Sequence, residues 1–466
     1  MMSQALRAGV GRAVINPPLG VVHAGWGAAT HVHATGFHMD LYATVLVLRS
    51  DDGALVFCDL DLCLIPNEVD KRVREAVAAA AGVDVNAVRL SMSHTHGGPE
   101  VQRSYASGAG SLAEAYLENL VHLVAGAAKQ ANDHLEPAVL TFGSGQANFA
   151  INRRQKLPEG RVVTGCNPEG FADHSLPLLR IDSAAGGPLA CMWGYAMHPT
   201  ILGPENTLMS PDYPGVARSI LEELTGATSL FLQGSAGNQG PGPGGFTGDL
   251  HAAERIGSAL GCEASKVYLS SEDLGVAEFD RVWESGAPLG KWKYGASHRK
   301  PAVLGVRNRL AMLPVKPAPS LSESTRESQE LREKLVDLRE DGAPAGEIES
   351  LTWRTKRAEM RVRHAREYEG LTEKGIEVQA FRVGETAFVA MPLEPFAEIG
   401  MRIKERSPFR LTHVSGYSNG WYGYLPTSES YLDGGYEVDT TPFQEGADEV
   451  MVRVAAEMLA ELATER

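Results

Sequence analysis

Cysteine is scarce in this sequence: it has five among 466 residues, scattered along the chain and none in a CxxC pair. An odd number at such spacings argues against a disulfide framework and against a cysteine-rich zinc site. The first residues also lack the charged-then-apolar pattern of a signal peptide. We therefore expect a cytoplasmic protein.

The sequence also has fewer basic than acidic residues. Lys and Arg together number 43 and Asp and Glu 58, which gives a net charge of −15 at pH 7. Nucleic acids and anionic membranes favour basic partners, so we expect no nucleic-acid partner. No apolar run approaches the roughly 20 residues that a membrane-spanning helix needs, so we also expect no stable membrane insertion.

What the sequence does contain is the alternation of strands and helices that is typical of α/β proteins. The expected order is a hairpin over 43–65, a helix over 66–81, a strand over 88–92, a helix over 112–132 and a strand over 138–142. A partly similar set follows, with a strand over 188–198, a helix over 213–224, a strand over 229–233 and a helix over 249–260. We predict layered mixed sheets with flanking helices, built as two similar halves that meet at a metal site.

The composition changes near residue 314. Residues 321–368 are dense in Glu, Arg and Lys, and an Asp-Gly-Ala-Pro turn at 341–344 divides them. This pattern predicts two charged helices in an antiparallel hairpin, which could be a solvated arm, a lid or an oligomer contact. The predicted organisation is a first part of the catalytic core over 1–313, the helical hairpin insertion over 314–374, and the C-terminal part of the core over 375–466.

Histidines stand at the ends of two apolar runs. His94 and His96 lie in Ser-His-Thr-His-Gly-Gly-Pro at 93–99, and His198 lies in Met-His-Pro-Thr at 197–200. Residues two apart in a strand share a face, so the HxH pair alone suggests that both imidazoles bind one metal ion, with two polar strand-end residues as the alternative. A catalytic zinc takes three or more protein ligands with N and O donors, so further donors are required.

Glu394 is a candidate for one of these donors. It follows an apolar strand between Pro392 and Pro395, and the alternative is a helix N-terminal carboxylate favoured by the helix dipole. Tyr424 and Tyr436 belong to a tyrosine-rich stretch for which ordinary packing is the default interpretation. The residues alone do not decide between these alternatives.

Several motifs together resemble the catalytic domain of the neutral/alkaline (non-lysosomal) ceramidase family. They are Gly-Val-Gly-Arg at 9–12, the motif at 93–99, Asn-Arg-Arg at 152–154, His-Pro-Thr at 198–200, Asp-Tyr-Pro-Gly at 212–215, Gly-Tyr-Leu-Pro-Thr at 423–427 and Gly-Tyr-Glu at 435–437. They occur in the family's order and span nearly the whole chain.

The resemblance implies a role for each matching residue. It implies a Zn²⁺ ion held by His94, His198, Glu394 and Tyr424. His96, Tyr436 and Arg153 would then face the substrate, so that His96 is no longer a ligand. Asp61 and Asp212 match residues expected to orient ligands or loops, with a helix-cap role as the alternative for Asp212, and His38 is a weaker pocket candidate.

The implied activity is hydrolysis of a linear amide by metal-activated water. The family's ceramide-acting enzymes carry an additional β-sandwich domain, and the loop at 236–241 lacks the acidic residue of their pattern. We therefore expect a smaller or soluble N-acyl substrate, and a homo-oligomer is possible through the charged hairpin. The alternatives are a zinc-dependent ester, lactone or cyclic-amide hydrolase and a binding protein stabilised by structural zinc.

Overall fold

The computed structural model describes residues 6–23, 26, 28–29, 31–51, 53–102, 111–243, 245–272, 275–295 and 302–464. Residues 1–5, which contribute to the expectation about a signal peptide, lie outside these ranges. One arrangement of elements occurs three times along the chain. Two antiparallel strand pairings are followed by a parallel one, and a helix lies in the crossover that the parallel pairing requires.

The first unit comprises β1 (Arg7–Val14), β3 (Tyr42–Ser50), β4 (Gly53–Leu60), α1 (Asn67–Ala81), β5 (Val88–Met92) and α3 (Ser111–Asp133). The second comprises β6 (Glu136–Gln146), β9 (Ser175–Ser183), β10 (Pro188–Tyr195), α4 (Asp212–Thr225), β12 (Thr228–Gln233) and α5 (Leu250–Ser270). The third comprises β16 (Leu304–Pro314), β17 (Glu373–Val383), β18 (Thr386–Ala390), α8 (Ala397–Arg406), β20 (Leu411–Ser415) and α10 (Ala447–Thr464).

Shorter elements connect these units. They are β2 (Gly36–Phe37) with β11 (Leu208–Met209), β7 (Ala150–Lys156) with β8 (Val162–Asn167) and β13 (Gln239–Pro241), β14 (Ala277–Trp283) with β15 (Leu289–Tyr294), β19 (Glu394–Pro395) with β21 (Tyr424–Leu425), α9 (Tyr436–Thr440), and the 3₁₀ turns at Val85–Ala87 and Ser428–Leu432. Among the helices of the described ranges, none combines the length and the apolar character needed to cross a membrane.

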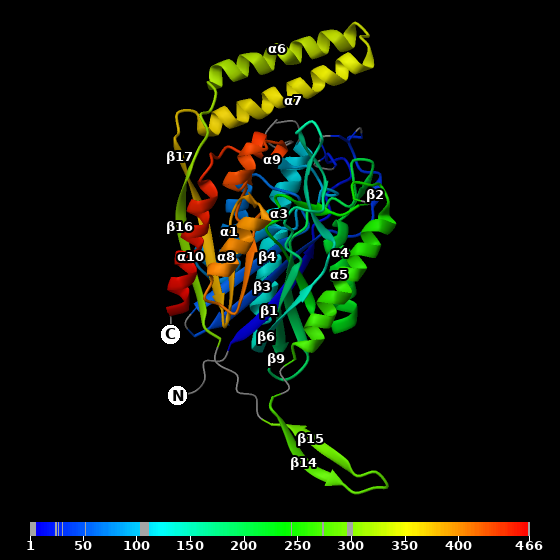
Figure 1. The fold of residues 1–466 in the computed structure, drawn as a ribbon, viewed down its shortest axis with the longest axis vertical. Helices are drawn as coiled ribbons and strands as arrows, with labels where there is room; N and C mark the ends of the chain where they lie inside the picture. Colours follow the sequence, from blue (N-terminus) through cyan, green and yellow to red (C-terminus); the bar gives the residue numbers. More distant parts are fainter. Residues whose placement is uncertain are drawn as a thin grey trace.

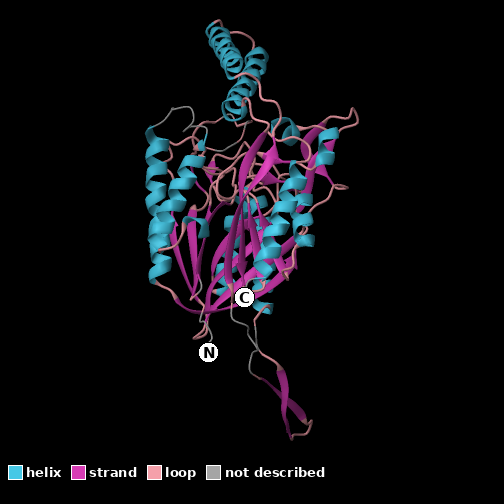
Figure 2. Cartoon of the chain, turned by 90° about the vertical axis from the view of Figure 1, so that its left-hand side faces the viewer, coloured by secondary structure: helices cyan, strands magenta, loops and turns pink. Residues whose placement is uncertain are grey.

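The three units form two large sheets with helices outside them. The first two units share an eight-stranded sheet, in which β1 pairs with β6, and the third forms a four-stranded sheet. An apolar core joins the two sheets, and in it the rings of Phe57 and Phe381 lie 5.3 Å apart between centroids. Three further cores lie under α1 and α3, under α4 and α5, and under α8 and α10. Figure 2 shows helices on the outer sides of the sheets.

The predicted mixed α/β class agrees with this architecture, but the internal organisation differs from the prediction. The strand pairing shows three similar units where the sequence suggested two halves. The strand expected over 188–198 ends at Tyr195, and the helix expected to end at residue 260 continues as α5 to Ser270. The sequence does not reveal the third unit because 58 residues, including the charged segment, lie between the end of its first strand at Pro314 and the start of its second at Glu373.

The charged segment forms α6 (Leu321–Glu340) and α7 (Ala345–Tyr368), which project from one end of the body (Figure 1). Their shared seam contains Leu331, Leu335, Leu351 and Ala358. In the sequence the two helices fall between β16 and β17, which pair with each other in antiparallel register throughout their length. Helix α9 lies at the same end of the body, while β14 and β15 project from the opposite end (Figure 1).

Buried polar side chains join the last strands of the three units. Arg89 of β5 donates through Nη2 to the Ser415 hydroxyl of β20 (2.6 Å), and that hydroxyl donates to the Gln233 carbonyl of β12 (3.0 Å). Asp59 of β4 accepts the backbone N–H of Phe231 in β12 (2.9 Å). These contacts link β5, β12 and β20, each of which runs parallel to its neighbouring strand. Sites in α/β folds form at the carboxyl ends of such strands.

Asp59 provides a pH-dependent test of this packing. Burial, with the neighbouring Asp61 carboxylate, raises the pKa of Asp59 to about 7. Between about pH 4 and 7 the Asp59 carboxyl is protonated in the folded protein, whereas in the unfolded chain, with its ordinary pKa near 4, it has lost this proton. The free energy of unfolding should therefore fall as the pH rises through this range. Asp59→Asn should flatten this part of the stability profile, measured by urea unfolding from pH 5 to 8. Parallel profiles for the two proteins would contradict the assignment.

Candidate metal centre

His94 lies in the loop that follows β5, beyond the strand itself. Its backbone adopts a left-handed conformation with φ of 66°. The ring Nδ1 donates to the Cys63 carbonyl (3.0 Å), so the lone pair of the neutral ring is on Nε2. The expectation that His94 and His96 share a strand face is therefore wrong, because β5 ends at Met92.

His198 lies three residues beyond the end of β10 and is held in the same manner. Its Nδ1 donates to the Ala236 carbonyl at 2.6 Å, in the loop that follows β12. This carbonyl fixes the ring orientation and leaves the Nε2 lone pair directed toward Glu394, whose Oε2 is 3.3 Å away. The two histidines thus have the same tautomer, and in each case a backbone carbonyl sets it.

Glu394 begins β19, which pairs in parallel with β21 so that Glu394 is opposite Tyr424. The Trp421 indole N–H donates to Oε1 (2.8 Å). The other oxygen, Oε2, is buried 3.6 Å from His94 Nε2, yet it makes no hydrogen bond within the described part of the chain. A buried carboxylate oxygen without a hydrogen-bond donor is costly unless another positive group satisfies it.

Together these three side chains form a group that could hold a metal ion. The ligand atoms of His94, His198 and Glu394 lie within 4.8 Å of one another, and all three residues are buried. Burial lowers the pKa of His94 to about 3 and also lowers that of His198, so both rings are neutral. Burial raises the pKa of Glu394, but the neighbouring His94 and His198 and the hydrogen bond from Trp421 lower it to about 2. Two neutral imidazoles and a carboxylate suit Zn²⁺.

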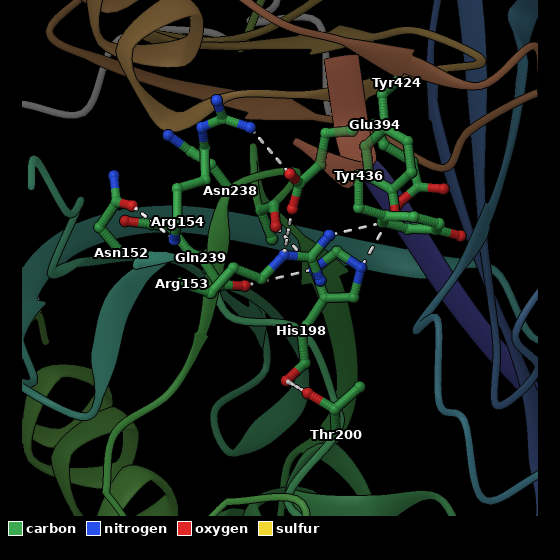
Figure 3. Close-up of polar contacts among 12 residues, drawn as sticks. Asn152, Arg153, Arg154, His198, Thr200, Asn238, Gln239, Glu394, Tyr424 and Tyr436 are labelled. Atoms are coloured by element: carbon green, nitrogen blue, oxygen red, sulfur yellow. Dashed lines mark hydrogen bonds and ion pairs between the residues drawn. The ribbon is translucent and has the colours of Figure 1, made fainter. Parts of the chain in front are cut away.

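An arginine pair and a glutamate border this group. Arg153 donates through Nε to Glu437 (2.9 Å) and through Nη2 to the Tyr424 hydroxyl (3.1 Å). Arg154 donates to the other oxygen of Glu437 (2.9 Å). Figure 3 shows Arg153 from β7, Glu394 from β19 and Tyr424 from β21 gathered near His198. Burial raises the pKa of Tyr424 well above its usual range, and Arg153 acts in the opposite direction.

His96 and Tyr436 lie at the edge of the group. His96 Nε2 is 3.3 Å from His94 Nε2, and the His96 ring lies 5.0 Å from that of Trp26 between centroids. Tyr436, the first residue of α9, is 52% exposed and makes an edge-to-face contact with Tyr424 at 5.7 Å. The seven residues predicted as metal ligands or as groups facing the substrate are therefore in or beside this cluster.

The three residues considered as supporting groups have different positions. Asp212 begins α4 and accepts the backbone N–H of Leu202 (2.9 Å), so it holds the loop that follows His198. Asp61 pairs with Arg218 (2.7 Å), in the buried network around Asp59. His38 forms a hydrogen bond with the Ser210 hydroxyl (2.9 Å).

Sequence reasoning missed the roles of Glu437, Arg154 and Trp421. The first two belong to motifs that carried the family resemblance, but nothing in their spacing indicated a shared ion pair. The 284 positions between Arg153 and Glu437 explain why no local pattern connects them. Trp421 stands three residues before Tyr424, where aromatic packing is the default expectation.

Comparison with known proteins relates the chain to a family. Residues 7–239 match the family model "Neutral/alkaline non-lysosomal ceramidase, N-terminal". A neutral ceramidase of Pseudomonas aeruginosa is 23% identical over 93% of this chain and 69% of its own length. Neutral ceramidase 1 of Arabidopsis thaliana is 25% identical over 41% of this chain and 25% of its own length.

The fold supports the same relationship. The crystal structure of the neutral ceramidase from Pseudomonas aeruginosa superimposes with a TM-score of 0.70, at 21% identity, over 98% of this chain and 74% of that one. A second structure, of a ceramidase complexed with C2, gives a TM-score of 0.69 over 99% of this chain and 75% of that one. The family match covers half of the sequence, and the shared fold extends over almost all of it. The chain belongs to the neutral/alkaline non-lysosomal ceramidase family.

Proposed function

We propose that this protein is a zinc-dependent hydrolase that cleaves a linear N-acyl amide bond. The observation that carries the proposal is the buried set of His94, His198 and Glu394, in which two imidazole lone pairs and an unsatisfied carboxylate oxygen lie together. The names of the relatives support the bond type, since ceramide is an N-acyl compound.

Four residues would hold the ion: His94, His198, Glu394 and Tyr424. Bound zinc supplies a Lewis acid that polarises a carbonyl and lowers the pKa of water toward ~7. The Cys63 and Ala236 carbonyls hold the two imidazoles in the required tautomer, and the Trp421 N–H orients Glu394. Tyr424 is the fourth donor in this proposal because it matches a ligand of the family that the chain resembles, and its pairing opposite Glu394 supports that assignment.

The remaining residues act on the substrate. Arg153 is a buried guanidinium fixed by Glu437, so its charge is in place before negative charge develops on the carbonyl oxygen. His96 and Tyr436, at the exposed side of the cluster, can donate to that oxygen or give a proton to the leaving nitrogen. Hydrolysis adds OH to the carbonyl carbon and H to the nitrogen, so both proton transfers have a residue within the cluster.

We further propose that the substrate is smaller or more soluble than ceramide. The support is the loop at 236–241, where Asn238 stands in place of the acidic residue in the pattern that the chain resembles. The Asn238 side chain donates to Glu398 (2.7 Å) and accepts the Ala397 N–H (2.8 Å). It is therefore engaged with the start of α8 and offers no carboxylate to a substrate.

The test is release of free amine from a graded series of N-acyl compounds, from short to long acyl chains and including a ceramide. Mass spectrometry should detect release that a zinc chelator stops and added zinc restores. Preference for short or soluble compounds supports the substrate proposal, and preference for ceramide refutes that part alone. No release from any amide by protein that holds stoichiometric zinc would refute amide hydrolysis and favour an ester or a cyclic amide.

A further inference from the structure

The hairpin formed by β14 and β15 extends away from the body at the end opposite α6 and α7 (Figures 1 and 2). Its strands pair in antiparallel register from Ala277 opposite Tyr294 to Trp283 opposite Leu289. The Gly295 N–H donates to the Val276 carbonyl (2.7 Å) and closes its base. We call this segment, residues 277–294, the arm.

One face of the arm is apolar. Phe279 is opposite Trp292, their rings meet edge to face at 5.8 Å, and Val282 and Tyr294 belong to neighbouring pairs on the same face. The exposed fractions of these four residues run from 48% for Val282 to 67% for Trp292. Since an aromatic side chain carries roughly 150–250 Å² of surface, this face shows several hundred Å² of apolar area.

The other face of the arm carries its charged residues, which are balanced within the arm. It also carries the exposed Trp283 and Leu289, which form the last pair before the tip, and Lys291 lies 4.6 Å from the Trp283 ring centroid. Glu278 is opposite Lys293, and Asp280 forms ion pairs with Arg281 (2.9 Å) and Lys293 (3.4 Å). The arm has three acidic and three basic residues, so its net charge is zero in a chain of net charge −15. The two faces therefore differ in charge: the face of Phe279 and Trp292 has no charged side chain, whereas the other face combines paired charges with Trp283 and Leu289.

An isolated two-stranded hairpin is at best marginally stable in water. An exposed apolar patch of this size indicates an interaction surface. The helices and sheets of the body do not cover the arm in either view (Figures 1 and 2). The arm is therefore expected to be covered by another molecule when the protein is assembled.

We propose that the arm is a dimerisation element whose apolar face, formed by Phe279, Val282, Trp292 and Tyr294, packs on the same face of a second copy. Because this face carries no charge and the arm has no net charge, two copies of a chain of net charge −15 can meet there without opposing like charges, in a twofold contact between identical surfaces. Stacking two such faces buries no ion and leaves the charged residues of both arms in water. An anionic membrane is the less favoured occupant, since it repels a chain of net charge −15.

Sedimentation velocity tests the proposal on the full chain. The molecular mass obtained for the wild-type protein should be twice the 50.0 kDa chain mass, and that of the double variant Phe279→Ser/Trp292→Ser should equal the chain mass. The matched control is Trp353→Ser on α7, which also removes a partly exposed tryptophan (38%) but should leave the dimer intact. Because the arm projects from the body, the double variant should retain the wild-type melting temperature.

Three outcomes would overturn the proposal. They are a wild-type protein that is monomeric at tens of micromolar, a double variant that remains dimeric, and a dimer that Trp353→Ser alone dissociates. A separate measurement tests the membrane as the occupant. Co-sedimentation with vesicles of phosphatidylcholine and phosphatidylglycerol that is lost in the double variant would overturn dimerisation and assign the arm to lipid.

A second variant, with the arm replaced by a short Gly-Ser linker, guards against misfolding of the substituted hairpin and should also be monomeric.

Discussion

Replacing His198 by alanine is expected to abolish metal binding and to lower amide hydrolysis by about a thousandfold or more, because several kcal/mol of transition-state stabilisation are lost. The substitution removes an imidazole whose Nε2 faces Glu394 and whose tautomer the Ala236 carbonyl fixes. The measurements are zinc content by mass spectrometry and amine release at saturating substrate. Circular dichroism should show that the fold survives.

The matched control for this experiment is His413→Ala. His413 is also buried, and burial lowers its pKa to about 3, but it lies under Gly194 and outside the metal centre. This variant should lose stability through the cavity it creates while keeping stoichiometric zinc. A His198→Ala protein with full zinc content and full activity would refute the ligand assignment.

Local patterns predicted the helices and strands of this chain well where the signal was itself local. The helix expected over 66–81 is α1 (Asn67–Ala81), ended as predicted by Gly82, which has the left-handed φ of 64° that favours glycine. The hairpin expected over 43–65 is β3 and β4, which pair in antiparallel register. Apolar runs bounded by turn residues specify such elements without help from the rest of the fold.

The pairing of strands that are far apart in the sequence could not be predicted in the same way. The third strand–helix unit has its first two strands separated by α6 and α7, so its similarity to the other two emerges only from strand pairing. The arm at 277–294 was not predicted either, although Phe279, Trp283 and Trp292 alternate with charged residues there. Such alternation predicts a half-buried strand, and only the structure shows that the described helices and sheets of the body leave it uncovered.

The residues of the site also divide into those that the sequence indicated and those that only the structure shows. His94, His198 and Glu394 could be proposed from the sequence because each follows an apolar run and is of a metal-binding type. The resemblance to a family then added Tyr424, which the structure places opposite Glu394. The contacts that orient these donors come from backbone carbonyls of Cys63 and Ala236, and no side-chain pattern can reveal a carbonyl.

Glu437 is the buried residue whose role the sequence concealed most completely, and it gives the second large prediction. It is 2% exposed and its two oxygens bind Arg153 and Arg154, both at 2.9 Å. Glu437→Gln leaves two buried guanidinium groups without their counter-charge. Since breaking a buried ion pair costs about 3–5 kcal/mol, the free energy of unfolding should fall by that order.

Hydrolysis should fall as well, by a route separate from stability. Arg153 also donates to the Tyr424 hydroxyl, so an Arg153 released from Glu437 no longer holds its charge beside the metal centre. Urea unfolding measures the first effect, and kcat/KM at a temperature where the variant is fully folded measures the second.

Asp448→Asn is the matched control, because Asp448 is equally buried but pairs with Arg402, which is partly solvated and outside the site. Its variant should lose less stability and keep both zinc and activity. The argument for Glu437 depends on the two neighbouring arginines, so a double-mutant cycle with Arg154→Met should recover part of the lost stability. Unchanged unfolding of Glu437→Gln would show that the buried arginines do not need this carboxylate.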